Sequence, residues 1–340
     1  MRAPTLRHPT LLQPTLRHPT LRHPTLRQLS NFVAAVETGS LSAAARALQV
    51  TQPAASQQVK ELERALSARL LQRGGGRVRL TAAGEAVLAQ ARRVQAAMDD
   101  LVAAAAAFQG GEAGRLRLGT GATACIHLLP PVLARMKQHM PGLDIIIATG
   151  NTADMLQRVL AGDLDLALVT LSGRLDRALE ARRLLEEPLV AYAQAAMLPA
   201  EAALGPAQLA ALPLILYESG GATRGVVDAW FRRGGAAPRP IMELGSVEAI
   251  KILAESGLGA TILPSGALRA PGSGMAVRAL RPAATRSLAV VLRRDKVRDR
   301  GLRVGLELLT ASALGMGAGQ SHFRTGPAAA PGRCHPSRPA

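Results

Sequence analysis

The stretch of residues 29–62 repeats its apolar residues at helical spacing, but helix-ending and helix-starting residues interrupt the pattern twice. Gly39 ends a first helix, and Ser40 caps a second. Thr51 then caps a third helix. Pro53 lies in the first turn of this helix, where a backbone N–H has no partner within the helix, so the N–H that proline lacks is not needed. This short stretch is therefore predicted to fold as three helices around one small core.

A basic segment follows the third helix. Three glycines at 74–76 precede the sequence Arg77–Thr81, in which basic and apolar residues alternate, and this pattern predicts a small β-hairpin, or wing. Residues 25–81 carry eight Lys and Arg against three Glu, the densest positive charge among the foldable segments of a chain with net charge +17. A polyanion is therefore expected to bind at this end.

Duplex DNA is the expected polyanion. Aromatic residues make up only 2% of the chain, and no two of them form the stacking arrays that hold single strands and RNA loops. The third helix carries a polar outer face that fits the major groove, where its N-terminal residues reach base edges first. The alternative is that this polar face is only solvated.

A long Ala-rich helix is predicted from about Ala82 to Phe108, closed by Gly110 and Gly111. One stripe of this helix is apolar, formed by Val87, Leu88, Ala91, Val94, Met98, Leu101 and Val102. Because little structure is attached to the helix, we expect a second copy of the chain to cover the stripe.

Strands and helices then alternate as far as residue 310. Two such series predict two α/β lobes of parallel strands with right-handed crossovers, a cleft between them, and hinges near 170 and 270. The domains that follow from these patterns are 25–81, 82–113 and 114–310.

The two ends of the chain are expected to be disordered. Residues 1–24 repeat the unit Pro-Thr-Leu-Arg-His or a close variant, which forms neither a helix ladder nor strand pairs, and residues 311–340 are rich in Gly, Ala and Pro. For the N-terminal repeat the alternative is a basic arm that contacts DNA phosphate.

The sequence from Ser40 to Glu63 resembles the helix-turn-helix of LysR-type transcriptional regulators. The resemblance covers about residues 25–310 and continues through Arg77–Thr81, Ala83–Glu85, Gly114–Gly119, Leu129-Pro130, Gly162–Ala167, Ser246–Lys251 and Gly257–Pro264. Leu41 and Leu71 stand where the family usually has Phe, and Gln57 replaces a frequent Arg. The Gln57 departure makes the operator sequence harder to infer.

The resemblance implies a mainly α winged helix-turn-helix, a linker helix, and a two-lobed α/β effector domain like a periplasmic binding protein. It implies a sequence-specific transcription factor that binds double-stranded promoter DNA. It also implies a dimer through helix 82–108 that forms a tetramer. A co-inducer is the only small molecule expected, without a cofactor or metal. RNA polymerase is left open as a partner.

The residues expected to contact DNA are Arg46, Thr51, Gln52, Pro53, Ser56, Gln57, Lys60, Arg77 and Arg79. Gln52 and Gln57 can each pair with adenine through two hydrogen bonds. The basic side chains reach phosphates, and those of the wing also reach the minor groove.

A small anionic metabolite is expected between the lobes, because ligands of open α/β sheets bind beyond the strands' carboxyl ends, near helix N-termini. The candidate residues are Thr120, Thr123, Asn151, Thr170, Ser219 and Thr223. At each position ordinary helix capping is an equal alternative, and for the neighbouring Arg224 the alternative is pairing with a carboxylate.

Three other classes of protein fit the sequence less well. Gly119–Ala124 imitates a dinucleotide fingerprint, but the required acid is missing from the end of the next strand, Ala148–Gly150, so an enzyme is not expected. A periplasmic solute-binding protein would not carry the helix-turn-helix, and a nucleoid protein would need no sensor lobes. A cytoplasmic solute-binding sensor with only nonspecific DNA affinity stays as the alternative function.

The expected location is the cytoplasm. No apolar run reaches the ~18 residues of a membrane span, and the polar N-terminus lacks the apolar core of a secretory signal. The two cysteines, Cys125 and Cys334, exclude a disulfide framework. Cys125 is expected to be a small buried hydrophobe, with a redox-sensing thiol as the alternative.

Overall fold

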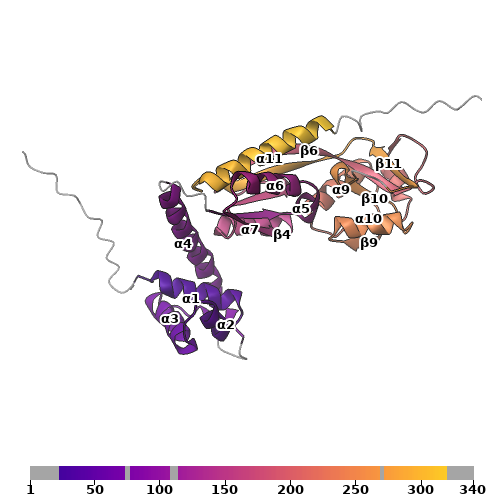
Figure 1. Ribbon diagram of the computed structural model, residues 1–340. Helices are drawn as coiled ribbons and strands as arrows, with labels where there is room; N and C mark the ends of the chain where they lie inside the picture. The colour runs from indigo at the N-terminus through magenta and orange to yellow at the C-terminus, as the bar shows by residue number, and fades with distance from the viewer. Residues whose placement is uncertain (1–22, 73–76, 108–113, 269–271, 320–340) are drawn as a thin grey trace, which may run out of the picture. The chain divides into compact units, whose positions relative to one another are not determined.

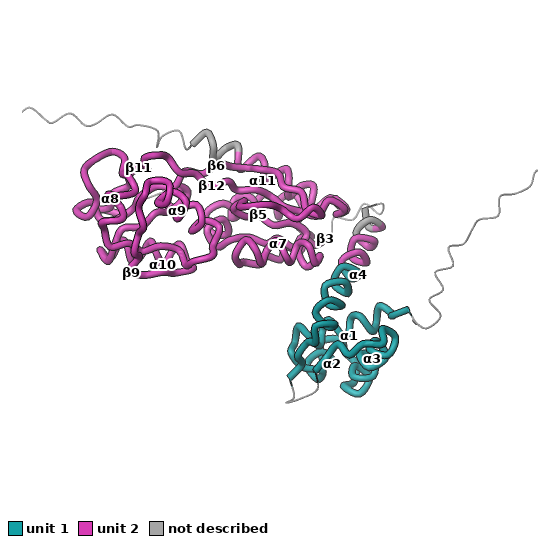
Figure 2. The backbone as a smooth tube through the Cα atoms, turned by 180° about the vertical axis from the view of Figure 1, so that it is seen from behind, with its two compact units in different colours: residues 1–95 teal, residues 96–340 magenta. Residues whose placement is uncertain are grey.

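The computed structural model describes residues 23–72, 77–107, 114–268 and 272–319 (Figure 1). The chain forms two compact units, residues 1–95 and 96–340, which are considered separately (Figure 2). Disorder is predicted for residues 1–24 and 311–340. Residues 1–22 and 320–340 lie outside the described residues, and residues 311–319 are helical, so the prediction is wrong there.

The first unit has the three helices and the hairpin that the sequence predicts. They are α1 Leu26–Glu37, α2 Leu41–Ala47, α3 Gln52–Ala65, and the antiparallel pair β1 Leu71–Gln72 and β2 Arg79–Leu80. The side chains of Thr25, Ser40 and Thr51 each accept a hydrogen bond from a first-turn N–H and so fix the three helix starts. The core centres on Phe32 and Leu62, which are fully buried.

Two polar contacts hold the wing against the helices. The Glu63 carboxylate accepts hydrogen bonds from the backbone N–H groups of Leu70, at 2.8 Å, and Leu71, at 3.2 Å. Thr81 caps α4, Ala82–Ala107, by accepting from Gly84 N at 2.9 Å. A Cβ at Gly84 would lie 2.1 Å from the Leu70 carbonyl oxygen, so this close approach requires glycine.

The apolar stripe of α4 is only partly exposed. Val87, Leu88 and Ala91 pack against the core of the first unit, which the sequence argument did not anticipate. The remaining stripe residues leave 39–62% of their surface exposed, namely Val94, Met98, Leu101 and Val102.

Lobe 1 of the second unit is built on a sheet in which β3 Gly114–Thr120 lies between β4 Leu143–Thr149 and β5 Leu166–Thr170, all parallel. The sheet continues through β12 Thr285–Arg293 to the first half of β6 Leu179–Gln194. One face is covered by α6 Leu129–His139 and α11 Arg300–Gly319, and the other by α7 Thr152–Ala161. The short α5, Ala122–His127, follows β3.

Lobe 2 uses the second half of β6, which pairs with β10 Thr261–Pro264 and β11 Met275–Leu280, and β11 also pairs with β7 Ala203–Leu204. A separate parallel pair is β8 Leu214–Tyr217 with β9 Pro240–Leu244. On one side lie α8 Pro206–Ala210 and α9 Ala222–Arg233, with Trp230 and Phe231 fully buried. On the other lie α10 Val247–Glu255 and the 3-10 turn Ser265–Leu268.

The two lobes are confirmed, but their sheets are mixed rather than wholly parallel. The long strands β6 and β12 form one antiparallel ladder that runs through both lobes. Leu185 and Leu288 belong to the core of lobe 1, whereas Leu189 and Ala284 belong to that of lobe 2. The chain therefore crosses between lobes at these positions, and the predicted hinges near 170 and 270 are misplaced.

The last helix also differs from its prediction, because α11 continues to Gly319 rather than ending at 310. Among the described helices, none is long and apolar enough to cross a bilayer.

Candidate functional site

The polar face of α3 forms a groove with the start of α2 and the wing. This groove has a volume of about 330 Å³ and brings together Gln52, Ser56, Lys60 and Arg77, four of the residues predicted from the sequence. Because the first three are spaced four residues apart on α3, they share one side of the helix. The groove thus places amide, hydroxyl and cationic groups on one surface.

The other predicted DNA-contacting residues do not line this groove. Thr51 caps α3, and Pro53 occupies its first turn. Arg46 and Arg79 are exposed. The Gln57 amide donates to the Glu61 carboxylate at 2.8 Å, so its donor is engaged within the helix. The groove also contains side chains that sequence reasoning did not assign to it, Ser40, Ser42 and Gln72, and only folding places them beside α3.

A second cavity, of about 310 Å³, lies within the second unit where both lobes contribute. Four predicted residues line it, Thr123, Asn151, Thr170 and Thr223. Thr120 and Ser219 do not. Thr120 is fully buried and its hydroxyl donates to the Leu168 carbonyl at 2.9 Å, whereas the Ser219 hydroxyl donates to Glu243 at 3.3 Å.

Both arginines of the cavity are already paired with carboxylates. Arg286, 4% exposed, lies 2.6 Å from Glu187 and also donates to the Thr223 hydroxyl at 3.2 Å. Arg224 lies 2.7 Å from Asp228 and 2.8 Å from Glu243, the pairing considered from the sequence. The cavity therefore holds cations whose charge is balanced.

Uncharged donors remain available in the cavity. The Tyr217 hydroxyl is buried beside the Thr123 side chain and makes no hydrogen bond of normal geometry with the described residues. Burial raises the pKa of Tyr217 to about 12, so the hydroxyl keeps its proton at neutral pH. Gly221 begins α9 without a side-chain cap, which leaves first-turn N–H groups free. By contrast, Asn151 caps α7 by accepting from Asp154 N at 2.9 Å.

Two family models cover most of the chain. Residues 26–85 match the bacterial regulatory helix-turn-helix protein of the lysR family, and residues 109–313 match the LysR substrate binding domain. The chain belongs to the LysR family of transcriptional regulators. It is a DNA-binding regulator with an effector-binding domain, and the family consists of regulators rather than enzymes.

Known relatives of this LysR-type regulator span most of its length. The transcriptional activator CmpR of Synechocystis is 35% identical over 69% of this chain and 77% of its own. The RuBisCO operon transcriptional regulator of Acidithiobacillus ferrooxidans is 32% identical over 72% of this chain and 78% of its own.

Solved structures share the fold. A full-length OxyR variant from Pseudomonas aeruginosa has a TM-score of 0.67 at 25% identity, covering 86% of this chain and 98% of its own. CbnR in complex with its target DNA has a TM-score of 0.61 at 24% identity, covering 85% and 99%.

The LysR-type regulator has a larger cavity beside the interlobe one. Its volume is about 1200 Å³, it lies between α7, α9 and residues 171–179, and it shares Thr152, Gly221 and Ala222 with the smaller cavity. The two cavities therefore adjoin each other. Cys125 is half-buried and in no disulfide. The described residues contain no cluster of His, Cys, Asp and Glu able to hold a metal ion.

Proposed function

We propose that this regulator reads its promoter through the α3 groove, with Gln52 and Ser56 toward the bases and Lys60 and Arg77 on phosphates. The observation that carries the proposal is the meeting of these four side chains in one groove. A major groove admits such a helix, and basic groups at its sides neutralise the backbone.

The test is a footprint on the DNA upstream of the regulator's own gene. A protected discrete site is the expected result, and uniform coating would favour nonspecific affinity instead. Lys60→Ala should lower the slope of log affinity against log salt by about 0.9, because one phosphate contact is lost. Arg233→Ala removes an exposed cation from the other unit and is the matched control, for which an unchanged slope is expected.

We also propose that the interlobe cavity takes a small anionic metabolite. The support is the set of neutral donors that converge there: the Tyr217 hydroxyl, the Thr123 hydroxyl and the uncapped start of α9. Because Arg224 and Arg286 already have carboxylate partners, an anion would be held by neutral donors in a region of balanced charge.

Calorimetric titration with small carboxylates and phosphates tests this assignment. We expect one equivalent to bind per chain and a weaker association in Thr123→Ala. If Thr123→Ala leaves the heat of binding unaltered, Thr123 is not part of the site. If only neutral solutes bind, the proposal that the ligand is an anion is contradicted.

We further propose a cytoplasmic dimer that forms through α4, with a tetramer on DNA and contact with RNA polymerase. The exposed Val94, Met98 and Leu101 stripe supports a partner helix on this face. In sedimentation, Leu101→Lys should weaken self-association at least about tenfold. Ala89→Lys, on an exposed position of the opposite side, should not.

A further inference from the structure

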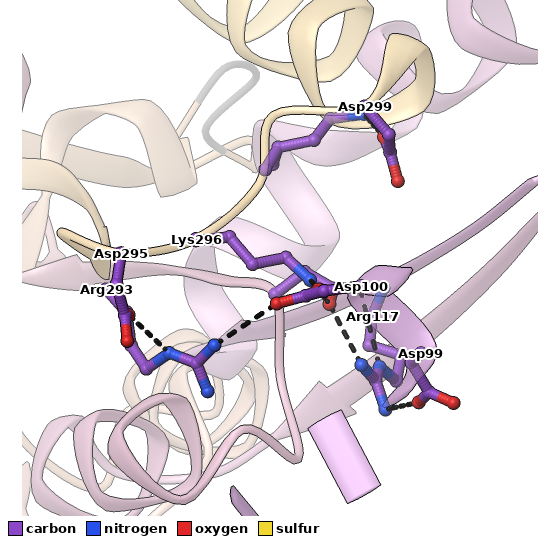
Figure 3. A network of polar contacts seen from close by, with 9 residues as sticks. Asp99, Asp100, Arg117, Arg293, Asp295, Lys296 and Asp299 are labelled. Carbon is purple, nitrogen blue, oxygen red and sulfur yellow. Dashed lines mark hydrogen bonds and ion pairs between the residues drawn. The ribbon is translucent and has the colours of Figure 1, made fainter. Parts of the chain in front are cut away.

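The last described turns of α4 are joined to lobe 1 by a series of alternating charges (Figure 3). Asp100 pairs with both Arg293, at 3.3 Å, and Lys296. Lys296 Nζ also lies 2.9 Å from Asp165 Oδ1. Two acidic and two basic groups from three separate segments therefore meet in one place.

The series returns to α4 through Arg117. Asp165 accepts from the Arg117 backbone N at 2.7 Å and from its Nη2 at 3.0 Å, and Arg117 Nη1 lies 3.0 Å from Asp99. We call this set of residues the linker clasp: Asp99, Asp100, Arg117, Asp165, Arg293 and Lys296.

The pattern of burial at this end of α4 is the reverse of a usual helix contact. The Asp100 side chain is only 10% exposed, whereas Leu101 and Val102 are each 62% exposed. Leu101 and Val102 therefore do not fasten these turns of α4 to lobe 1. Among the side chains described there, Ala96 and Asp100 are buried, and Asp100 makes the charged contacts with lobe 1. Removing Asp100 would take one carboxylate from two largely buried cations, which would leave Lys296 with Asp165 and Arg293 with the exposed Asp295.

Lys296 and Asp165, the two central groups of the clasp, are held in their charged forms. Burial opposes the charge of Lys296, but the Asp165 and Asp100 carboxylates together outweigh it and raise the pKa of this ammonium. Burial likewise opposes the charge of Asp165, but the hydrogen bonds from Arg117 lower the pKa of its carboxyl.

The strands that carry the clasp also reach the interlobe cavity. β3, β5 and β12 are neighbours in the sheet, and β12 runs antiparallel to the other two. Two of the strands have a clasp residue at or next to one end and a cavity residue at or near the other: Asp165 and Thr170 for β5, Arg293 and Arg286 for β12. β3 carries Arg117 at its middle and leads into α5, which holds the cavity residue Thr123. Three hydrogen-bonded strands thus connect the two sites directly.

We propose that Asp100 is a positioning residue that makes the end of α4 move with lobe 1. A molecule bound in the cavity then changes the dynamics of the linker helix α4 through β3, β5 and β12. The first half of this inference concerns attachment and is independent of any ligand. The second half rests on the effector site proposed above.

The attachment is tested by hydrogen exchange of the full-length protein, read by mass spectrometry at residues 96–107 and, as an internal reference, at β5. Asp100→Asn should speed exchange at 96–107 by about tenfold without changing β5, because the turns open locally once the carboxylate is gone. Asp100→Glu, which keeps the charge, should restore most of the protection.

The matched control is Asp144→Asn, which breaks an exposed pair with Arg115 at 3.7 Å in the same lobe and should change neither segment. Exchange at 96–107 that is equal in wild type and Asp100→Asn would overturn the attachment. If Asp100→Asn does not fold, Lys296→Gln replaces it, with a smaller increase expected because Arg293 stays on Asp100.

The coupling is tested with a side chain that stands in for a bound molecule. Ala222 lies between the two cavities, and Ala222→Trp fills this space. We expect at least a threefold change in exchange at 96–107, in either direction, and no such change when Asp100→Asn is also present. Ala196→Trp, on an exposed turn, is the control.

A purely structural role for Asp100 would make the two substitutions act independently, and that result would overturn the coupling while leaving the attachment in place. Failure of the effector proposal is seen separately, as an absence of heat with small anions in calorimetry, and it changes neither exchange comparison.

Discussion

Gln52 and Gln57 carry the same side chain five residues apart on α3, but their surroundings differ. The Gln57 amide already donates to Glu61 at 2.8 Å. The Gln52 side chain lines the groove and makes no hydrogen bond with the described residues. Gln52 can therefore meet a base edge without first giving up an internal bond, whereas Gln57 cannot.

Gln52→Ala should weaken binding to the promoter site by roughly 1–3 kcal/mol and leave binding to random DNA nearly unchanged, since a paired base contact carries about that discrimination. Fluorescence anisotropy on the two DNAs measures both affinities. Gln57→Ala serves as the comparison and should lose less. Equal losses on specific and random DNA would refute base readout by Gln52.

Tyr217 and Tyr192 form a second informative pair. The Tyr192 hydroxyl donates to Glu255 at 2.7 Å, and burial raises the pKa of this tyrosine too to about 12, whereas the Tyr217 hydroxyl makes no hydrogen bond of normal geometry with the described residues. Tyr192→Phe should cost about 1–2 kcal/mol in unfolding free energy, and Tyr217→Phe about zero.

The loss in Tyr217→Phe should instead be in the affinity for a small anion, measured by calorimetry. A Tyr217→Phe protein that is strongly destabilised but binds normally would contradict the assignment of this hydroxyl to a ligand.

At the scale of elements, the junction between the wing and α4 depends on Gly84. A Cβ there would lie 2.1 Å from backbone oxygen, which cannot move aside as a flexible side chain could. Gly84→Ala should therefore destabilise the first unit by roughly 2–4 kcal/mol, measured by urea unfolding of the full-length protein.

Gly225→Ala is the control for helix propensity. Gly225 lies in α9 with nothing within 4 Å of an added Cβ, so the substitution should be neutral or stabilise by about 0.5–1 kcal/mol. A similar response of the two variants would mean that the steric argument at Gly84 fails.

Sequence reasoning found the elements whose signals are local. The caps Ser40 and Thr51 mark helix starts directly, and both helices begin at the residue that follows. The first half of β6 could not be predicted in this way, because the segment from Glu180 to Pro188 is largely charged and lacks an apolar alternation. Its pairing with β12 defines this strand instead.

For the sites too, the sequence indicates residues whose signal is local, but not those that only the fold brings together. Thr123 and Thr223, which line the cavity, could be proposed from the sequence because hydroxyls after strands are a local signal. Tyr217 reads as an ordinary strand residue, and Arg286 reaches the cavity only because β12 returns from the far end of the chain. Thr120 does not line the cavity, because its hydroxyl donates to the Leu168 carbonyl of the neighbouring strand, a contact that the sequence does not reveal.

At the scale of the whole molecule, the linker clasp sets a pH range for the second unit. The folded pKa of Asp165 is lowered, so its stabilisation is present above the ordinary carboxyl pKa and is lost as the pH falls through the folded value. The folded pKa of Lys296 is raised, so its stabilisation is present below the ordinary lysine pKa and is lost as the pH rises. The full contribution spans about pH 4 to pH 10.

Asp165→Asn should accordingly cost about 3–5 kcal/mol across that range, because Lys296 and Arg117 lose a buried partner. Urea unfolding from pH 3 upward measures the difference from wild type, which should shrink below about pH 4. A difference that is constant down to pH 3 would mean that the carboxylate charge is not what stabilises this region.

Lobe 1 is assembled from both ends of the second unit, since β5 is hydrogen-bonded to β12, which lies after all of lobe 2 in the chain. On the ribosome, the strand that completes the lobe 1 sheet therefore emerges on the order of ten seconds after β5, at ordinary rates of translation. Lobe 2 can fold first, and until β12 emerges one edge of β5 has no paired strand. A nascent chain at this stage offers an open strand edge, and chaperones that shield such edges would bind it during that interval.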